Sequence, residues 1–138
     1  MSIPLYSGIV HAAAPAIINL INLGGIGMAF TDISVSGVNF SAAAPGTVQI
    51  EADIEAQYND PSFGATTLPF HQMNWFGLAT AVGQITNNIQ LGPNQWTRSF
   101  PSPLIMPSSS LINLNVSLLV NCSGLNFAVD ISGFTFSV

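Results

Sequence analysis

Apolar and polar residues alternate with a period of two over much of the chain. The most regular stretch is residues 48–59, where Val, Ile, Ala, Ile, Ala and Tyr fill the even positions and Gln, Glu, Asp, Glu, Gln and Asn fill the odd positions. Residues 112–122 repeat the pattern, with Leu119 as the one exception on the polar side. Successive side chains of a β-strand point to opposite faces of its sheet, so both stretches predict strands with one buried face.

Two further apolar stretches change phase at a glycine. In residues 33–40 the apolar side chains move to the other parity after Gly37, and in residues 129–138 they do so after Gly133. A glycine inside a strand accommodates the extra residue of a β-bulge. A bulge or bend is therefore predicted at both positions.

Shorter stretches, bounded by Gly, Pro and Asn, predict the remaining strands. They are residues 75–85, 95–100, 5–9 and 66–70, of which the last two are the weaker candidates. Residues 99–110 contain three prolines and predict a loop or a segment that covers a sheet edge. Seven or eight strands at this spacing predict an all-β fold, an antiparallel β-sandwich.

The pattern predicts one helix, over residues 13–23. Pro15 suits the first turn of such a helix, and Gly24 suits the position after its last turn. Residues 1–30 are therefore predicted to form an apolar arm or lid, and residues 31–138 the β-sandwich domain. Two arrangements stay open: a lid over an open end of the sandwich, or an arm that docks on a neighbouring subunit. The candidate interface residues of this segment are Leu5, Tyr6, Ile17, Ile18, Leu20 and Ile21.

Charged residues are rare in this chain. Only 5% of the 138 residues are charged, whereas an ordinary soluble domain has about 25%. Such a surface suits a permanent assembly, where charges would have to be desolvated, and acid surroundings or lipid contact are two further settings for it. The single arginine cannot neutralise several phosphates, so direct basic contacts to nucleic acid are not expected. The single cysteine excludes an intrachain disulfide, and no basic residue precedes the apolar N-terminal stretch, so no secretory signal peptide is expected.

Three carboxylates share one face of the strand predicted over residues 48–58. Glu51, Asp53 and Glu55 are two residues apart, which separates successive members by about 7 Å, and oxygen ligands of this kind suit Ca²⁺. The glycine-rich loop of the common calcium motif is absent, so a solvated outer face is preferred and a metal site is the weaker interpretation. His11 and His71 stand in no zinc motif, and no nucleophile elbow or phosphate loop is present. No catalytic site and no cofactor are therefore predicted.

Three Asn-x-Ser sequences begin at Asn39, Asn115 and Asn121. They match the acceptor pattern for N-glycosylation, which they permit without requiring. Adjacent aromatic residues at Trp75 and Phe76 are typical of a core or an interface. They leave a carbohydrate-binding platform as an alternative.

The size, the strand count, the missing charge and the missing signal peptide together resemble the small single jelly-roll coat proteins of viruses. The resemblance is one of architecture and spans most of the chain. It implies a jelly-roll-like sandwich whose copies tile a virion shell edge to edge, together with other structural proteins. It also implies that residues 1–30 are the arm that reaches a neighbour.

The resemblance favours a structural, self-assembling subunit of a virion shell, a capsid protein found in the virion or on an extracellular surface. Two alternatives stay open: a subunit of an extracellular filament or surface layer, and a β-sandwich module that binds glycan or lipid. Membrane contact through the N-terminal segment also stays open. A hydrolytic enzyme is not expected, because charged groups and imidazoles are too few to build a workable site.

Overall fold

The computed structural model describes residues 2–85, 89–90 and 97–137. Over these ranges every regular element is a β-strand, and no helix that is long and apolar enough to cross a membrane occurs there. The strands are β1 (Ile3–Ala12), β2 (Ala16–Asn22), β3 (Ile26–Ala42), β4 (Gly46–Asp60), β5 (Gly64–Ala79), β6 (Gly83–Ile85), β7 (Ile89–Gln90), β8 (Thr97–Met106), β9 (Leu111–Val120) and β10 (Cys122–Ser137).

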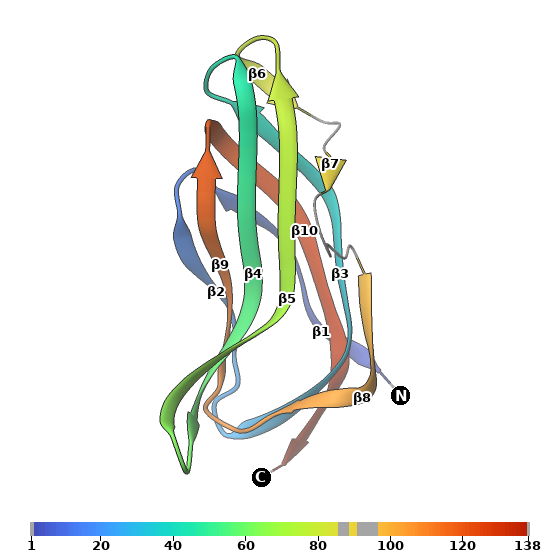
Figure 1. Ribbon diagram of the computed structural model, residues 1–138. Helices are drawn as coiled ribbons and strands as arrows, with labels where there is room; N and C mark the ends of the chain where they lie inside the picture. Colours follow the sequence, from blue (N-terminus) through green and yellow to red (C-terminus); the bar gives the residue numbers. More distant parts are fainter. Residues whose placement is uncertain (1, 86–88, 91–96, 138) are drawn as a thin grey trace.

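The strands form two five-stranded sheets that face each other (Figure 1). The first sheet has the order β1-β10-β3-β6, and β8 pairs with a different part of β3. The second sheet has the order β2-β9-β4-β5-β7. Every pairing among the described strands is antiparallel. The predicted all-β, antiparallel sandwich is therefore confirmed.

The core lies between the two sheets and consists of the apolar sides of the alternating stretches. The even-numbered residues from Val48 to Ala56 on β4 are buried, as are Ile112, Leu114 and Val116 on β9. The indole of Trp75 packs against the ring of Phe127 on the opposite sheet, with 5.6 Å between the ring centroids. The register predicted for residues 48–58 is therefore confirmed, and the register predicted for residues 112–122 holds as far as Val116. A bulge at Ser117 then places Leu118 opposite Glu51 on the outer face, and Leu119, opposite Ile50, packs against the core. The inward orientation predicted for Leu118 and Val120 is therefore wrong, and Val120 is exposed.

The strand predicted over residues 112–122 ends earlier than expected. β9 stops at Val120, because Asn121 adopts a left-handed backbone conformation with φ of 55° and turns the chain. Cys122 then begins β10. The two residues after Val120 continue the apolar–polar alternation but belong to a turn and to the other sheet.

The predicted N-terminal helix is wrong, because residues 16–22 form β2. This strand pairs with β9 along its length, from Ala16 opposite Val116 to Asn22 opposite Leu111. Isoleucine is β-branched and favours strands, and seven residues are too few for a helix to be stable without packing. Residues 16–22 form a strand and not a helix because the edge of β9 offers them a partner for backbone hydrogen bonds. The predicted division at residue 30 falls inside β3, and residues 3–30 include the edge strands of both sheets.

The proline-rich segment, predicted as a loop or as a segment that covers a sheet edge, is largely a strand, β8, that lies along the edge of β3. It pairs with β3 in two parts, at residues 97–99 and 104–106, and the register shifts between them. Pro101 and Pro103 lie in the unpaired part between these two stretches. An edge strand tolerates proline where no ladder hydrogen bond is required of its nitrogen. The strand predicted over residues 95–100 begins outside the described residues.

β5 joins two predicted strands into one and contains a bulge. Residues 66–70 and 75–79 both belong to it, and the predicted continuation to residue 85 is interrupted by a turn before β6. Along the β4–β5 pair, Ile54 lies opposite His71 whereas Glu55 lies opposite Pro69. Phe70 is therefore the extra residue, and the side chains of Phe70 and His71 are both buried although they are consecutive.

The two glycine phase changes coincide with irregularities in the pairing of β3 with β10. The register shifts between Ser36 and Asn39, which brackets Gly37, and again at Gly133. A Cβ atom placed on Gly133 would overlap the backbone carbonyl oxygen of Ala29. The bulge predicted at Gly37 is confirmed. At Gly133 the extra residue is Thr31 of β3, so the bulge lies on the partner strand and not on the strand for which it is predicted. Glycine is needed at position 133 because the two backbones approach closely.

Candidate functional site

Glu51, Asp53 and Glu55 lie along β4 on the outer face of the second sheet. The residues between them face the core, as the alternation predicts. The strand register places amide residues on both sides of this row: Asn115 of β9 and Gln72 of β5 are the partners of Asp53. The row is thus a stripe of carboxylates flanked mainly by amide residues, with Leu118 opposite Glu51 and Pro69 opposite Glu55.

Two of these carboxyl groups are coupled. Burial, the negative charge of Glu55 and a hydrogen bond between the two side chains together raise the pKa of Asp53 to about 6. Glu55 is only 6% exposed. The Oδ1 atom of Asp53 is buried and has no hydrogen-bond partner in the described part of the chain. Below about pH 6, Asp53 therefore holds a proton that it can donate to Glu55.

The carboxylate stripe borders a small polar hollow. Its volume is about 240 Å³ and it is lined by Glu51, Ala52, Asp53, Gln72, Asn74 and Ser117. Within the described ranges, no three His, Cys, Asp or Glu side chains are grouped so that they could hold a metal ion. The structure thus places the weak calcium candidate in a row along one strand, and it gathers no cage of oxygen ligands around a point.

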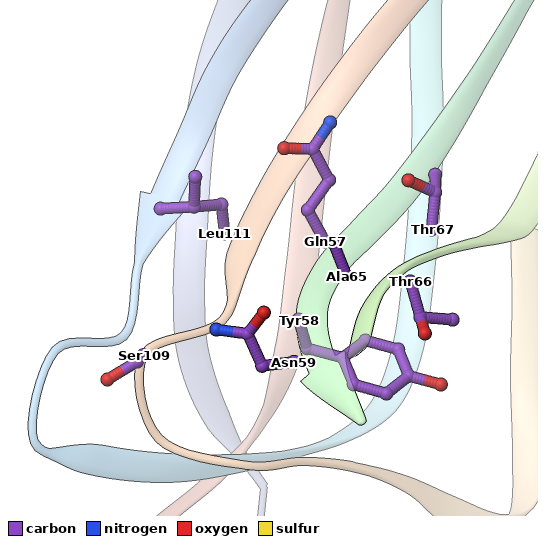
Figure 2. A pocket seen from close by; sticks show the side chains of 8 residues that line it. All are labelled: Gln57, Tyr58, Asn59, Ala65, Thr66, Thr67, Ser109 and Leu111. Atoms are coloured by element: carbon purple, nitrogen blue, oxygen red, sulfur yellow. The ribbon is translucent and has the colours of Figure 1, made fainter. Parts of the chain in front are cut away.

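A second polar hollow lies at the end of the β4–β5 hairpin, beside the turn between β8 and β9 (Figure 2). Its volume is about 380 Å³. Figure 2 shows the Tyr58 ring on the side of Thr66 and the Asn59 amide on the side of Ser109. Its lining residues are Gln57, Tyr58, Asn59, Ala65, Thr66, Thr67, Ser109 and Leu111. These groups offer neutral hydrogen bonds and one aromatic ring, and none of them is an acid, a base or a thiol.

The six predicted interface residues lie on β1 and β2. Ile21 is buried in the core, and Ile17 is exposed. The other four are partly buried and pack against the core: Leu5, Tyr6, Ile18 and Leu20. Of the six, Ile17 offers the largest part of its side chain to a partner.

The three Asn-x-Ser sites differ in how their amides are used. The Nδ2 atom of Asn121 donates to the carbonyl oxygens of Ala44, at 2.8 Å, and Thr47, at 3.3 Å. A sugar on that nitrogen would displace at least one of these bonds. Asn39 accepts a long hydrogen bond on the outer face of the first sheet, and Asn115 is half-buried on the outer face of the second. Modification at any of the three stays a prediction.

The imidazoles of the chain occupy separate places. His11 lies on the outer face of the first sheet, where its Nδ1 atom is 2.7 Å from the Oδ1 atom of Asn126. His71 is 2% exposed and lies on the second sheet. The two imidazoles therefore belong to different sheets.

Sequence reasoning missed a set of exposed apolar side chains. Phe63 is 85% exposed, Ile9 80% and Leu78 70%, and Val82 and Ile105 are also largely exposed. A signal was present for two of them, because Phe63 and Val82 interrupt turns in which polar residues are usual. Figure 1 shows that the loop before β5 and the far end of β5 lie at opposite ends of the sandwich. The exposed apolar groups therefore lie on several sides of the molecule.

Comparison with known proteins finds no protein-family model and no curated protein that matches the chain. What the chain does is therefore inferred from its fold and its surface. Within the described residues the surface combines two shallow polar hollows, few charges and several separate apolar positions.

Proposed function

We propose that this chain is a structural subunit with a jelly-roll fold that assembles with copies of itself into a closed shell, as a virion coat protein does. The strand order supports the fold. When the short strands β6 and β7 are left aside, the remaining eight pair as first–eighth–third–sixth and second–seventh–fourth–fifth. This interleaving of two four-stranded sheets is the jelly-roll arrangement.

The distribution of exposed apolar side chains is the observation that carries the proposal. Phe63 precedes β5 and Leu78 lies near its other end, so the 16 residues of this strand separate them by about 50 Å. Ile9 and Ile17 are exposed on the opposite lateral side, on β1 and β2. A simple dimer covers one patch, whereas a shell subunit meets neighbours on several sides.

The scarcity of charge supports the same proposal. With six acidic groups and one basic group, the surface has little of the charge that keeps a free domain soluble and monomeric. Neutral side chains donate the hydrogen bonds on the outer face of the first sheet: Asn126 donates to Asn39 at 3.4 Å, and Ser7 donates to the carboxylate of Asp130 at 2.6 Å. Such groups lose less on desolvation than ions do.

One observation favours a second candidate function, a module that binds a neutral polar ligand such as a glycan. The hollow in Figure 2 offers amides, hydroxyls and the ring of Tyr58, which are groups that contact sugars. The hollow is open and its lining is spread over three strands and a turn. A single shallow site of this kind leaves the apolar positions on the other sides without a role, so the shell is preferred.

Sizing of the purified protein tests the proposal. Light scattering behind a sizing column, followed by electron microscopy, should show closed particles of uniform size at micromolar concentration. Open filaments would select the filament alternative. A monomer that persists at high micromolar concentration, and that binds a glycan array, would replace the shell with the binding module.

A further inference from the structure

The two lateral sides of the sandwich end in different kinds of strand. On one side the outermost strands are β1 in the first sheet and β2 in the second, and each pairs with a neighbour on one side only among the described residues. On the other side the outermost strands are β8 and β6 in the first sheet, and β5 with the short β7 in the second. An edge strand exposes a row of backbone N–H and C=O groups, which can pair with another strand.

The side formed by β5 and β8 is blocked against such pairing. β5 contains Pro69 and the bulge at Phe70. The guanidinium of Arg98 on β8 donates to the backbone carbonyl of Phe70, and it also lies 4.7 Å above the centre of the Phe100 ring. β8 itself carries two prolines. Proline, bulges and a charged side chain at the edge are the features by which proteins prevent strand addition.

The β1 edge lacks these features over most of its length. Its proline, Pro4, and its bulge lie at its beginning. From Tyr6, opposite Ile131, to Ala12, opposite Leu125, the pairing with β10 runs without a register shift. These seven residues contain no proline and no charged side chain, and they extend about 23 Å. Ile9, in the middle of them, is 80% exposed.

We propose that the free edge of β1 pairs, antiparallel and across a two-fold axis, with β1 of a second copy of this chain. The backbone groups that point away from β10 form an edge that is open to another strand, and a β-strand can pair with the whole row at once. A second copy fits because residues 6–12 are neutral, so identical edges approach without repulsion, and because an antiparallel pair of identical strands is two-fold symmetric. The pairing joins the first sheets of two subunits into one continuous sheet. This inference rests on the proposed self-assembly and names one of its contacts.

Cysteine cross-linking tests this pairing directly. In an antiparallel two-fold pair only the residue at the axis lies opposite its own copy, with Cα atoms about 5 Å apart. A residue two positions away is separated from its own copy by about 14 Å along the strand, which is beyond the reach of a disulfide. Single cysteines are therefore placed at Ser7, Gly8, Ile9, Val10 and His11 in turn, in a Cys122→Ser background.

Disulfide-linked dimers should form at one of these positions several-fold more than at the positions two residues to either side. Ser102→Cys, at an exposed residue on the blocked edge of β8, serves as the matched control for random collision. A flat profile, or a maximum only in the control, would overturn the edge pairing. Amide hydrogen exchange of the unmodified protein provides a second measurement that needs no variant. Alternate amides of residues 6–12 should exchange at least tenfold more slowly in the assembly than in the dissociated chain, and equal rates would also overturn the pairing.

The outcomes separate this inference from the proposed function. If large particles form and the cross-linking profile is flat, the shell stands and its contacts lie elsewhere. If the profile has a maximum and only dimers form, the edge pairing stands and the shell does not. If the chain is monomeric and the amides of β1 exchange freely, both proposals fail.

Discussion

Replacing Asp53 with asparagine should stabilise the protein at neutral pH. In the folded chain the pKa of Asp53 is about 6, compared with 3.8 for the unperturbed group, because of burial and the adjacent Glu55. A difference of about two pH units corresponds to about 3 kcal/mol. Asp53 keeps part of its surface in solvent, and solvent screening lowers the expected contribution to about 1 kcal/mol. Asparagine has nearly the same shape and carries no charge, so it removes this penalty.

The raised pKa of Asp53 makes the stability of the folded chain depend on pH. The folded chain binds the proton of Asp53 more tightly than the unfolded chain does, so its contribution to stability is fully present below about pH 4. It is lost as the pH rises through about 6. Wild type and Asp53→Asn should therefore be equally stable at pH 3.5, and the variant should be the more stable of the two at pH 7.

Thermal unfolding followed by circular dichroism, from pH 3.5 to pH 7 at one fixed protein concentration, measures this difference. A change of about 1 kcal/mol corresponds to a rise in Tm of roughly 3–4 °C for a chain of this size. Glu51→Gln is the matched control, because it removes one negative charge from the same strand face two residues away. It should change stability by less than about 0.5 kcal/mol. An Asp53→Asn variant that is less stable than wild type at pH 7, or whose gain persists at pH 3.5, would refute the raised pKa of Asp53 in the folded chain.

Three further predictions concern the fold. Gly133→Ala should prevent the accumulation of soluble folded protein, because the new methyl group would overlap a backbone carbonyl oxygen. Gly25→Ala is the control: nothing lies within 4 Å of its new methyl group, so it should keep the wild-type Tm. Soluble expression and circular dichroism of the two variants measure the difference. Arg98→Met should lower unfolding free energy by about 1–2 kcal/mol in a urea titration, because the Phe70 carbonyl loses its donor, and Arg98→Lys should recover part of the loss. Ile54→Ala, at a fully buried core position, should cost about 2–5 kcal/mol in the same titration, and a cost under 1 kcal/mol would contradict the assigned register.

Some properties of the carboxylate stripe follow from the sequence, and others depend on the tertiary structure. The period of two places Glu51, Asp53 and Glu55 on one face, because successive residues of any extended strand point in opposite directions. The near-complete burial of Glu55 and the raised pKa of Asp53 depend on which strands flank β4 and on the bulge at Phe70. Neither can be read from the spacing of the carboxylates.

By itself, the sequence determined the all-β class, the buried faces of β4 and of the first half of β9 and the bulge at Gly37, because each is a local consequence of alternation or of a missing Cβ atom. The mostly apolar residues within 13–23 fit either a helix or a strand, and only the edge of β9, almost a hundred residues away along the chain, selects a strand over residues 16–22. Pro101 and Pro103 are compatible with a loop or with an edge strand, and the pairing of β8 with β3 selects the strand. Only the tertiary structure decides that β8 is a blocked edge and β1 an open one, because an edge strand is one that has a neighbouring strand on one side only.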